Sequence, residues 1–286
     1  MLTTYQTKYP ERLTLRDKIY QYIDDLVELG VDLPESLKRR DKREPRRKDK
    51  ELVEDMLQKA YTRHFQRKAK LLRERLTVYY PNRKSFIGDI IDFLGLDEIF
   101  NGDDELERQM VKLIGAAAVG GVELFEESVT LQMDYTMVYS DVAEWARKHA
   151  GKAIKDINAT TLKAVRKSVS RFVETPGYTI GDIMGELTSH GLDAKRARMI
   201  AITETTNAYA EGQKLAGIEL QKKNPGVLVI KRWYTNNDDR VCDICGPLNG
   251  KEVAMDEMFD EERGISQPAA HVNCRCWMST QTRINA

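Results

Sequence analysis

The stretch VLVIKRWYTNNDDRVCDICGPLNGKEV, residues 227–253, changes the character of this chain. Its first nine residues are mostly β-branched, aromatic or apolar and follow the turn signal NPG at residues 224–226, so they predict a strand. The Asn249–Gly250 pair between short apolar flanks predicts a hairpin. Between the two lies a Cys-x-x-Cys at Cys242 and Cys245. The last 60 or so residues are therefore expected to form a small antiparallel β module.

Upstream of this stretch the sequence predicts helices almost throughout. Thr179 is expected to cap a short helix that ends before Gly191, and Asp193 to cap a long helix that reaches about Leu220. Earlier helices are expected over residues 105–128, over DYTMVYSDVAEWARKHAGKAI with Ser140 as its cap, and from Thr160–Thr161 onward. The glycines at positions 115, 120 and 121 match no phosphate-loop pattern and indicate close packing against another helix.

The N-terminal third is basic, although the net charge of the chain is zero. Residues 1–85 carry 22 Lys and Arg against 14 Asp and Glu, and the remainder carries 23 against 31. The surplus is concentrated in KRRDKREPRRKDK, residues 38–50. Such a run is typical of contact with nucleic acid or an acidic protein surface, while a solvated linker or helix face has the same composition. The candidate contact residues are Lys38, Arg39, Arg40, Lys42, Arg43, Arg46, Arg47 and Lys48.

A short amphipathic helix is expected before this run, within residues 1–34, and a charged helix after it, up to about Tyr80. The apolar stripe of the second helix is ragged, which predicts that its partner lies elsewhere; its members are Leu52, Met56, Ala60, His64 and Ala69. The predicted organisation is a charged docking segment over residues 1–85, a helical region over 86–149, and a third domain over 150–286.

The longest apolar run, LIGAAAVGGV at residues 113–122, is too short to cross a bilayer. The N-terminus lacks the apolar stretch of a signal peptide, so the chain is expected in a reducing cytoplasm and not at a membrane.

All four cysteines lie near the C-terminus, beside one of only four histidines. A Cys-x-x-Cys turn presents two sulfurs to one point, which suits tetrahedral Zn²⁺, and HVNCRC offers a second half-site about 25 residues later. Zinc needs four ligands and five candidates are present. If HVNCRC is extended, Cys274 and Cys276 share a face and both bind; if it turns, His271 pairs with one cysteine. Both ligand sets fit the sequence.

Three other kinds of site could use the same cysteines. A redox Cys-x-x-Cys would open a helix in a βαβ unit, whereas here a strand runs into a hairpin signal. A Cys–His nucleophile pair would use His271, but no cysteine is singled out. A nuclease with a zinc-braced catalytic turn would also need His271. The preferred interpretation is a structural zinc clip, because the β module is too short to bury its own core. The predicted fold class is therefore α+β: a predominantly helical chain with a C-terminal β module clipped by a Cys/His cluster.

Several segments, in this order, resemble the phage Mu F-like family of minor head proteins. They are a helix with Thr203–Glu204–Thr205, a strand with Trp233, a block read as Asp239–Arg240–Cys242–Cys245–Leu248–Gly250, and a final block of Pro268–His271–Asn273–Cys274–Arg275–Cys276. The resemblance covers about residues 150–280. Ile202 stands where the family is usually basic, so no charge pairing is carried over to this helix.

The resemblance implies a non-enzymatic minor capsid protein that acts in head morphogenesis at the portal, and in DNA packaging or ejection. It also implies portal and head proteins as partners, contact with packaged DNA, and a place in the virion after assembly in the host cytoplasm. A nuclease, a toxin-like enzyme or a DNA-binding accessory protein are the alternatives. From the residues themselves, Glu204 is interpreted either as a contact to the C-terminal module or as a solvated charge, and Asp239 and Arg240 as residues that orient the Cys-x-x-Cys turn.

Overall fold

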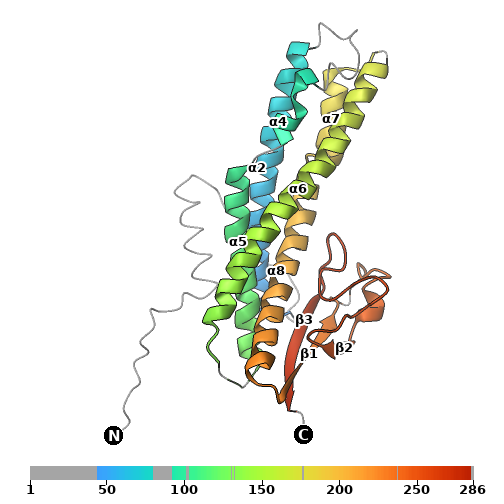
Figure 1. Ribbon diagram of the computed structural model, residues 1–286. Helices are drawn as coiled ribbons and strands as arrows, with labels where there is room; N and C mark the ends of the chain where they lie inside the picture. Colours follow the sequence, from blue (N-terminus) through green and yellow to red (C-terminus); the bar gives the residue numbers. More distant parts are fainter. Residues whose placement is uncertain are drawn as a thin grey trace.

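The computed structural model describes residues 44–79, 92–100, 103–129, 131, 133–175, 177–236 and 238–284. Its elements are α2 (Arg47–Tyr79), α4 (Leu96–Phe100), α5 (Asp104–Ser128), α6 (Thr136–Glu174), α7 (Ile180–His190), α8 (Ala194–Lys223), β1 (Val227–Tyr234), the 3-10 turn η3 (Gly246–Leu248), β2 (Glu252–Ala254) and β3 (Trp277–Ile284). The long helices form an elongated bundle, and the strands stand beside α8 (Figure 1). This confirms the α+β fold class. The helix expected within residues 1–34 lies outside the described residues.

The bundle is built around the crossing of α5 and α8, where each helix has a glycine at the point of contact. A Cβ added at Gly121 would overlap the carbonyl oxygen of Tyr209, and one at Gly212 would overlap that of Ala118. Each glycine therefore lets its helix rest directly on the backbone of the other. The prediction of close helix packing is confirmed at Gly121, while Gly212 was not recognised because it lies in an unbroken helical pattern.

Helix α6 is a single helix of 39 residues where two helices were expected. Thr160 and Thr161 do not start a helix: their hydroxyls donate to the carbonyls of Asp156 and Ile157, one turn earlier, at 2.8 and 2.7 Å. A threonine whose hydroxyl bonds back in this way is tolerated inside a helix. Ser140 also lies inside α6. The helix begins four residues earlier, where the Asp134 carboxylate accepts the backbone N–H of Thr136 at 2.9 Å.

The predicted starts of α7 and α8 are confirmed. Thr179 accepts the backbone N–H of Asp182 at 3.1 Å, and the Asp182 carboxylate accepts the backbone N–H of Thr179 at 2.8 Å, a reciprocal capping box. The Asp193 carboxylate accepts the backbone N–H of Arg196 at 2.6 Å. These bonds satisfy N–H groups that a helix start otherwise leaves without partners.

Helix α2 packs against α5 and α8, so its partner lies within the chain. The fully buried members of its face are Val53, Leu57, Tyr61, Phe65, Leu72 and Leu76. The expected stripe is part of this buried side of the helix: Met56, Ala60, His64 and Ala69 are buried, and Leu52 packs partly buried against the core. Polar side chains share it. His64 is 2% exposed, and Lys68 reaches the Asp103 carboxylate at 2.6 Å beside it. Because Lys68 and Asp103 form an ion pair, neither charge is buried without a partner.

The described strands form one antiparallel sheet in the order β2-β1-β3, in which Ile230 of β1 faces Ala254 of β2 and Gln281 of β3. The hairpin expected at Asn249–Gly250 is wrong: the residues before it form η3, and the pair only turns the chain into β2, with Gly250 at φ 81°. Glycine adopts this φ without the steric cost that other residues meet. The long segment 235–251 between β1 and β2 carries the Cys-x-x-Cys.

Candidate metal centre

The C-terminal module has a small core of its own, separate from that of the bundle. Trp233 is fully buried and meets Phe259 edge to face, with 5.2 Å between ring centroids. The buried members of this core are Trp233, Cys245, Leu248, Phe259, Ile265, Cys274 and Cys276. Three of the seven are cysteines, so thiols occupy positions that aliphatic side chains fill in a larger domain.

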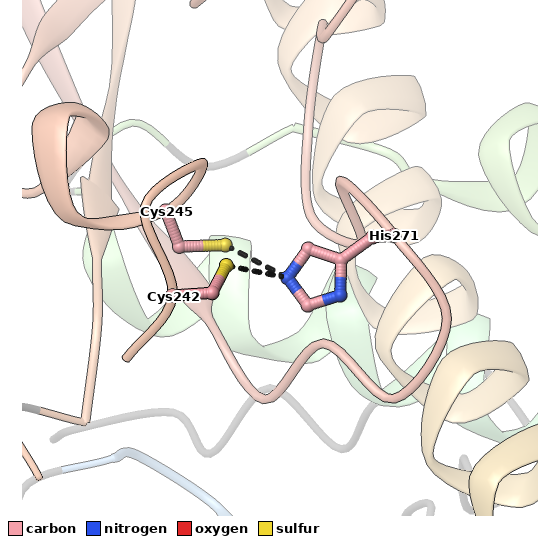
Figure 2. Close-up of side chains that lie close together, drawn as sticks. All are labelled: Cys242, Cys245 and His271. Carbon is pink, nitrogen blue, oxygen red and sulfur yellow. Dashed lines mark hydrogen bonds between the residues drawn. The ribbon is translucent and has the colours of Figure 1, made fainter. Parts of the chain in front are cut away.

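Cys242, Cys245 and His271 converge on one point, as Figure 2 shows. The Nε2 atom of His271 lies 3.1 Å from the sulfur of Cys242 and 3.2 Å from that of Cys245. The two cysteines come from the loop before η3, where the Cys245 and Gly246 backbone N–H groups both donate to the Cys242 carbonyl. The histidine comes from the loop before β3. The centre therefore joins two segments that are far apart in the sequence.

Cys245 also belongs to a second group of three, with Cys274 and Cys276, whose sulfurs lie within 4.8 Å of one another. The sulfurs of Cys245 and Cys274 are 3.8 Å apart. Two thiolates bound tetrahedrally at about 2.3 Å from a zinc ion are separated by about 3.8 Å, so this pair already has the spacing of a zinc site. All five candidates predicted from the sequence lie in or beside this one cluster.

The HVNCRC segment both turns and extends, so it combines the two conformations that the sequence left open. The backbone N–H of Cys274 donates to the His271 carbonyl at 3.2 Å, closing a turn with Asn273 at φ 63°. Beyond Cys274 the chain straightens into β3. The turn brings His271 to Cys242, while the straight part places Cys274 and Cys276 beside Cys245.

The other ring nitrogen of His271 sets its tautomer. Nδ1 lies 2.9 Å from the carbonyl oxygen of Val272 and can only donate to it. A proton on Nδ1 leaves the lone pair of Nε2 directed at the two sulfurs, as a histidine ligand requires. A nuclease mechanism would need this nitrogen free for a substrate, whereas here it faces the thiols.

The thiols influence one another's protonation. A side-chain hydrogen bond with Cys245 lowers the pKa of Cys274, and the same bond raises the pKa of Cys245. Burial opposes charge on His271, but the hydrogen bond to Val272 and the nearby thiolates raise the pKa of His271. The thiols therefore share their protons, and a bound cation would replace those protons and neutralise the resulting thiolates. The donor set and its spacing fit a structural metal ion.

An ion pair braces the two halves of the centre. Arg275 donates to both carboxylate oxygens of Asp238, at 2.7 and 2.8 Å, and these bonds lower the pKa of Asp238. Asp238 also accepts the backbone N–H of Arg240 at 3.1 Å. The orienting role assigned to Asp239 therefore belongs to Asp238, which has the Asp-x-Arg-x-Cys spacing; Asp239 is exposed.

Helix α8 holds the loop that carries His271. Thr203 accepts the backbone N–H of Asn273 at 2.8 Å, and Asn207 accepts that of Ala269 at 2.9 Å. Thr206 donates to the Cys274 carbonyl at 3.3 Å. These residues recur at helical spacing on one face, a signal that could have marked them. Sequence reasoning singled out Glu204 instead.

Glu204 contacts neither the module nor solvent. Its carboxylate lies 2.5 Å from Nε2 of His149 on α6, and its side chain is 12% exposed. Trp145 stacks on the other side of this histidine, at 4.7 Å between centroids. Glu204 therefore links α8 to α6, and both earlier interpretations of it are wrong.

In the described part of the basic run, both arginines are engaged in ion pairs within the chain. Arg46 pairs with Glu123 and Glu127 of α5, and Arg47 pairs with Glu44 and Glu51. Lys48 is exposed. The other candidate contact residues, Lys38, Arg39, Arg40, Lys42 and Arg43, lie outside the described residues.

Comparison with known families gives one match: residues 159–279 match the family described as Phage Mu protein F like protein. The match begins within α6, ends in β3, and contains all five candidate ligands. Neither the curated proteins nor the solved structures that were compared gave a match. Among the described residues, no helix is both long and apolar enough to span a membrane.

Proposed function

Because residues 159–279 match the family described as Phage Mu protein F like protein, we propose that this protein is a structural minor head protein of a tailed phage or prophage. The family points to phage head morphogenesis and to other head proteins as partners. The finer assignments are part of the proposal: action at the portal, a contribution to DNA packaging or ejection, contact with packaged DNA, and assembly in the host cytoplasm before incorporation into the virion.

The observation that carries a structural role is the position of the Cys/His cluster. Three of its cysteines belong to the buried core of the module, and its histidine directs Nε2 at the two sulfurs of the Cys-x-x-Cys. A ligand set that closes on itself is typical of structural zinc, whereas catalytic zinc keeps one position for water or substrate. We assign the cluster the task of joining the loop before η3 to the loop before β3.

The proposed ligands are Cys242, Cys245, His271 and Cys274. The first three already meet, and the sulfur of Cys274 stands at zinc-site spacing from that of Cys245. Cys276 is the remaining thiol; it packs in the module core as a neighbour of the centre. When bound, the ion supplies charge neutralisation and cross-linking of the two loops, and Arg275 keeps them aligned through Asp238.

The test combines metal analysis with particle assembly. Purified protein is expected to hold one zinc per chain; Cys274→Ser abolishes binding, while Cys276→Ser retains it. In a phage that lacks its own copy, the wild-type chain and Cys276→Ser are expected to restore infective particles, and Cys274→Ser is not. Full particle yield from a metal-free Cys274→Ser chain would show that the clip plays no part in assembly. Metal-dependent DNA cleavage by the wild-type protein would replace the structural role with an enzymatic one.

A further inference from the structure

A cavity of about 960 Å³ opens beside the metal centre, where α2, α8 and the C-terminal module meet. We call it the cleft. Its walls come from the start of α2, the first turns of α8, the segment after β1, and the loop with His271. The cleft is thus walled on one side by the centre, and His271 is the candidate ligand that also lines it.

Three cations on these walls form no ion pair with a described carboxylate, although Arg240 lies near enough to Asp238 to help lower the pKa of that carboxyl group. Lys195 and Arg198 are exposed on α8, and Arg240 is exposed in the loop before the Cys-x-x-Cys. Arg198 donates only to the side-chain oxygen of Gln58, at 3.3 Å. The other two arginines of the cleft, Arg47 and Arg275, are already neutralised by carboxylates. The unpaired positive charge of the cleft is therefore concentrated on Lys195 and Arg198, with Arg240 beside Asp238.

Apolar side chains stand beside these charges. Val272, at the tip of the metal loop, is 64% exposed, and Met199 on α8 is 38% exposed. A polyphosphate backbone is best matched by a wall of cations alone, whereas this wall also carries Glu44, Glu54 and Asp238. A mixed wall with apolar contacts suits a protein segment that presents acidic side chains around an apolar one.

The module carries such a segment on its own surface. In the turn after β2, MDEMFDEER, five of the residues 256–262 are acidic. We call residues 256–262 the acidic tip. Asp260 pairs with Arg263 at 2.7 Å, whereas Asp256, Glu257, Glu261 and Glu262 are exposed and form no ion pair within 4 Å with a described residue. Glu257 accepts the backbone N–H of Ala254, and Asp256 and Glu257 act on the buried Lys231, so Glu261 and Glu262 carry the free charge of the tip. Met258, 45% exposed, lies between them.

We propose that the cleft receives the acidic tip of a second copy of this chain. Within one chain the two do not meet: no residue of the tip lines the cleft. In such a contact the cleft of one chain binds the tip of the next, so the arrangement is head to tail. Head-to-tail contacts produce rings or open filaments and not symmetric dimers. This proposal concerns self-assembly and stands whether or not the protein acts in a phage head.

The test is sedimentation velocity of the zinc-loaded full chain over a range of concentrations, at low and high salt. The wild-type chain is expected to associate as its concentration rises, and less at high salt, because screening weakens contacts between exposed charges. The double variant Lys195→Glu with Arg198→Glu reverses the cleft, and Glu261→Lys with Glu262→Lys reverses the tip without touching the surroundings of Lys231. Each is expected to weaken association at least about tenfold.

Mixing the two variants gives the decisive result. The cleft-reversed chain keeps an intact tip and the tip-reversed chain keeps an intact cleft, so the mixture recovers association that neither variant shows alone. Two matched controls are expected to behave as wild type: Lys152→Glu with Lys155→Glu, and Asp141→Lys with Asp156→Lys. These positions are exposed on α6 and change the net charge equally.

Three outcomes overturn the proposal. The first is a wild-type chain that stays monomeric at every concentration and salt. The second is association that either reversal leaves intact, or that the mixture fails to restore. The third is a monomeric chain that binds a labelled single-stranded oligonucleotide through Lys195 and Arg198, which would assign the cleft to nucleic acid instead.

Discussion

In the helical bundle the tightest contact is backbone on backbone, where α5 and α8 cross at Gly121 and Gly212. In the C-terminal module it is a cluster of cysteines around His271. The bundle core draws on every described helix from α2 to α8, while the module core contains seven buried residues. A long helix contributes apolar side chains at every turn and needs no cross-link, whereas three strands and their loops do not bury enough surface to hold themselves.

The largest difference between the two regions is expected when the metal clip is removed. Cys245→Ala, or chelation of the metal, is expected to unfold the module while the bundle persists, because structural zinc contributes on the order of 10 kcal/mol. The emission of Trp233 should move to longer wavelength while helical circular dichroism is largely kept. Cys276→Ala empties a buried site in the same core without removing a proposed ligand, so it should keep the metal. Loss of helix together with the module would show that the two regions fold as one unit.

The next prediction concerns the bundle. Gly212→Ala places a methyl group against the Ala118 carbonyl, which neither helix can avoid without moving, so the expected loss of stability is about 3 kcal/mol in urea unfolding. Gly185→Ala on α7 is the matched control, because a Cβ there meets nothing within 4 Å. It should be neutral or stabilise by about 0.5–1 kcal/mol. Equal effects of the two substitutions would show that close contact at the crossing is not what requires glycine.

The two regions also differ in how far the sequence predicted them. The caps at Thr179 and Asp193 were predictable because capping depends on a few adjacent residues. The break expected near Thr160 was not real, since a threonine serves equally well inside a helix once its hydroxyl bonds backward. The candidate ligands were predictable from their spacing. The arrangement of the ligands relative to one another was not predictable. It depends on a turn at Asn273 followed by extended chain, whereas the sequence was compatible with either conformation for the whole segment.

A smaller effect is expected where the two regions join. Asn207→Ala removes the acceptor of the Ala269 N–H, at a cost of about 1–2 kcal/mol. Because Ala269 lies in the loop that carries His271, the loss should appear as weaker zinc affinity and faster metal release. Asn158→Ala on α6 removes a buried amide from the bundle and should lower stability without changing metal release. Unchanged release rates in Asn207→Ala would show that α8 does not position the metal loop.

The smallest expected effect is a pH dependence confined to the module. Lys231 of β1 is 1% exposed and donates to the carbonyls of Met255 and Ser266 at 2.9 and 2.8 Å. Burial, and then Lys214, lower the pKa of Lys231 to about 8, against the opposing effect of Asp256, Glu257 and Glu211. A lysine whose pKa falls on folding binds fewer protons in the folded state, so between about pH 8 and its unfolded value stability rises with pH.

Lys231→Met isolates this contribution. The variant loses both hydrogen bonds and should be less stable than wild type. The difference in the free energy of unfolding should grow as the pH rises above 8, because Lys231 of the folded wild type then loses its proton and its buried charge. Urea unfolding of both zinc-loaded proteins at several pH values gives the difference, in which cysteine titrations common to both cancel. A difference that stays constant would mean that Lys231 titrates alike in both states. The module would then bury this charge without a penalty that depends on pH.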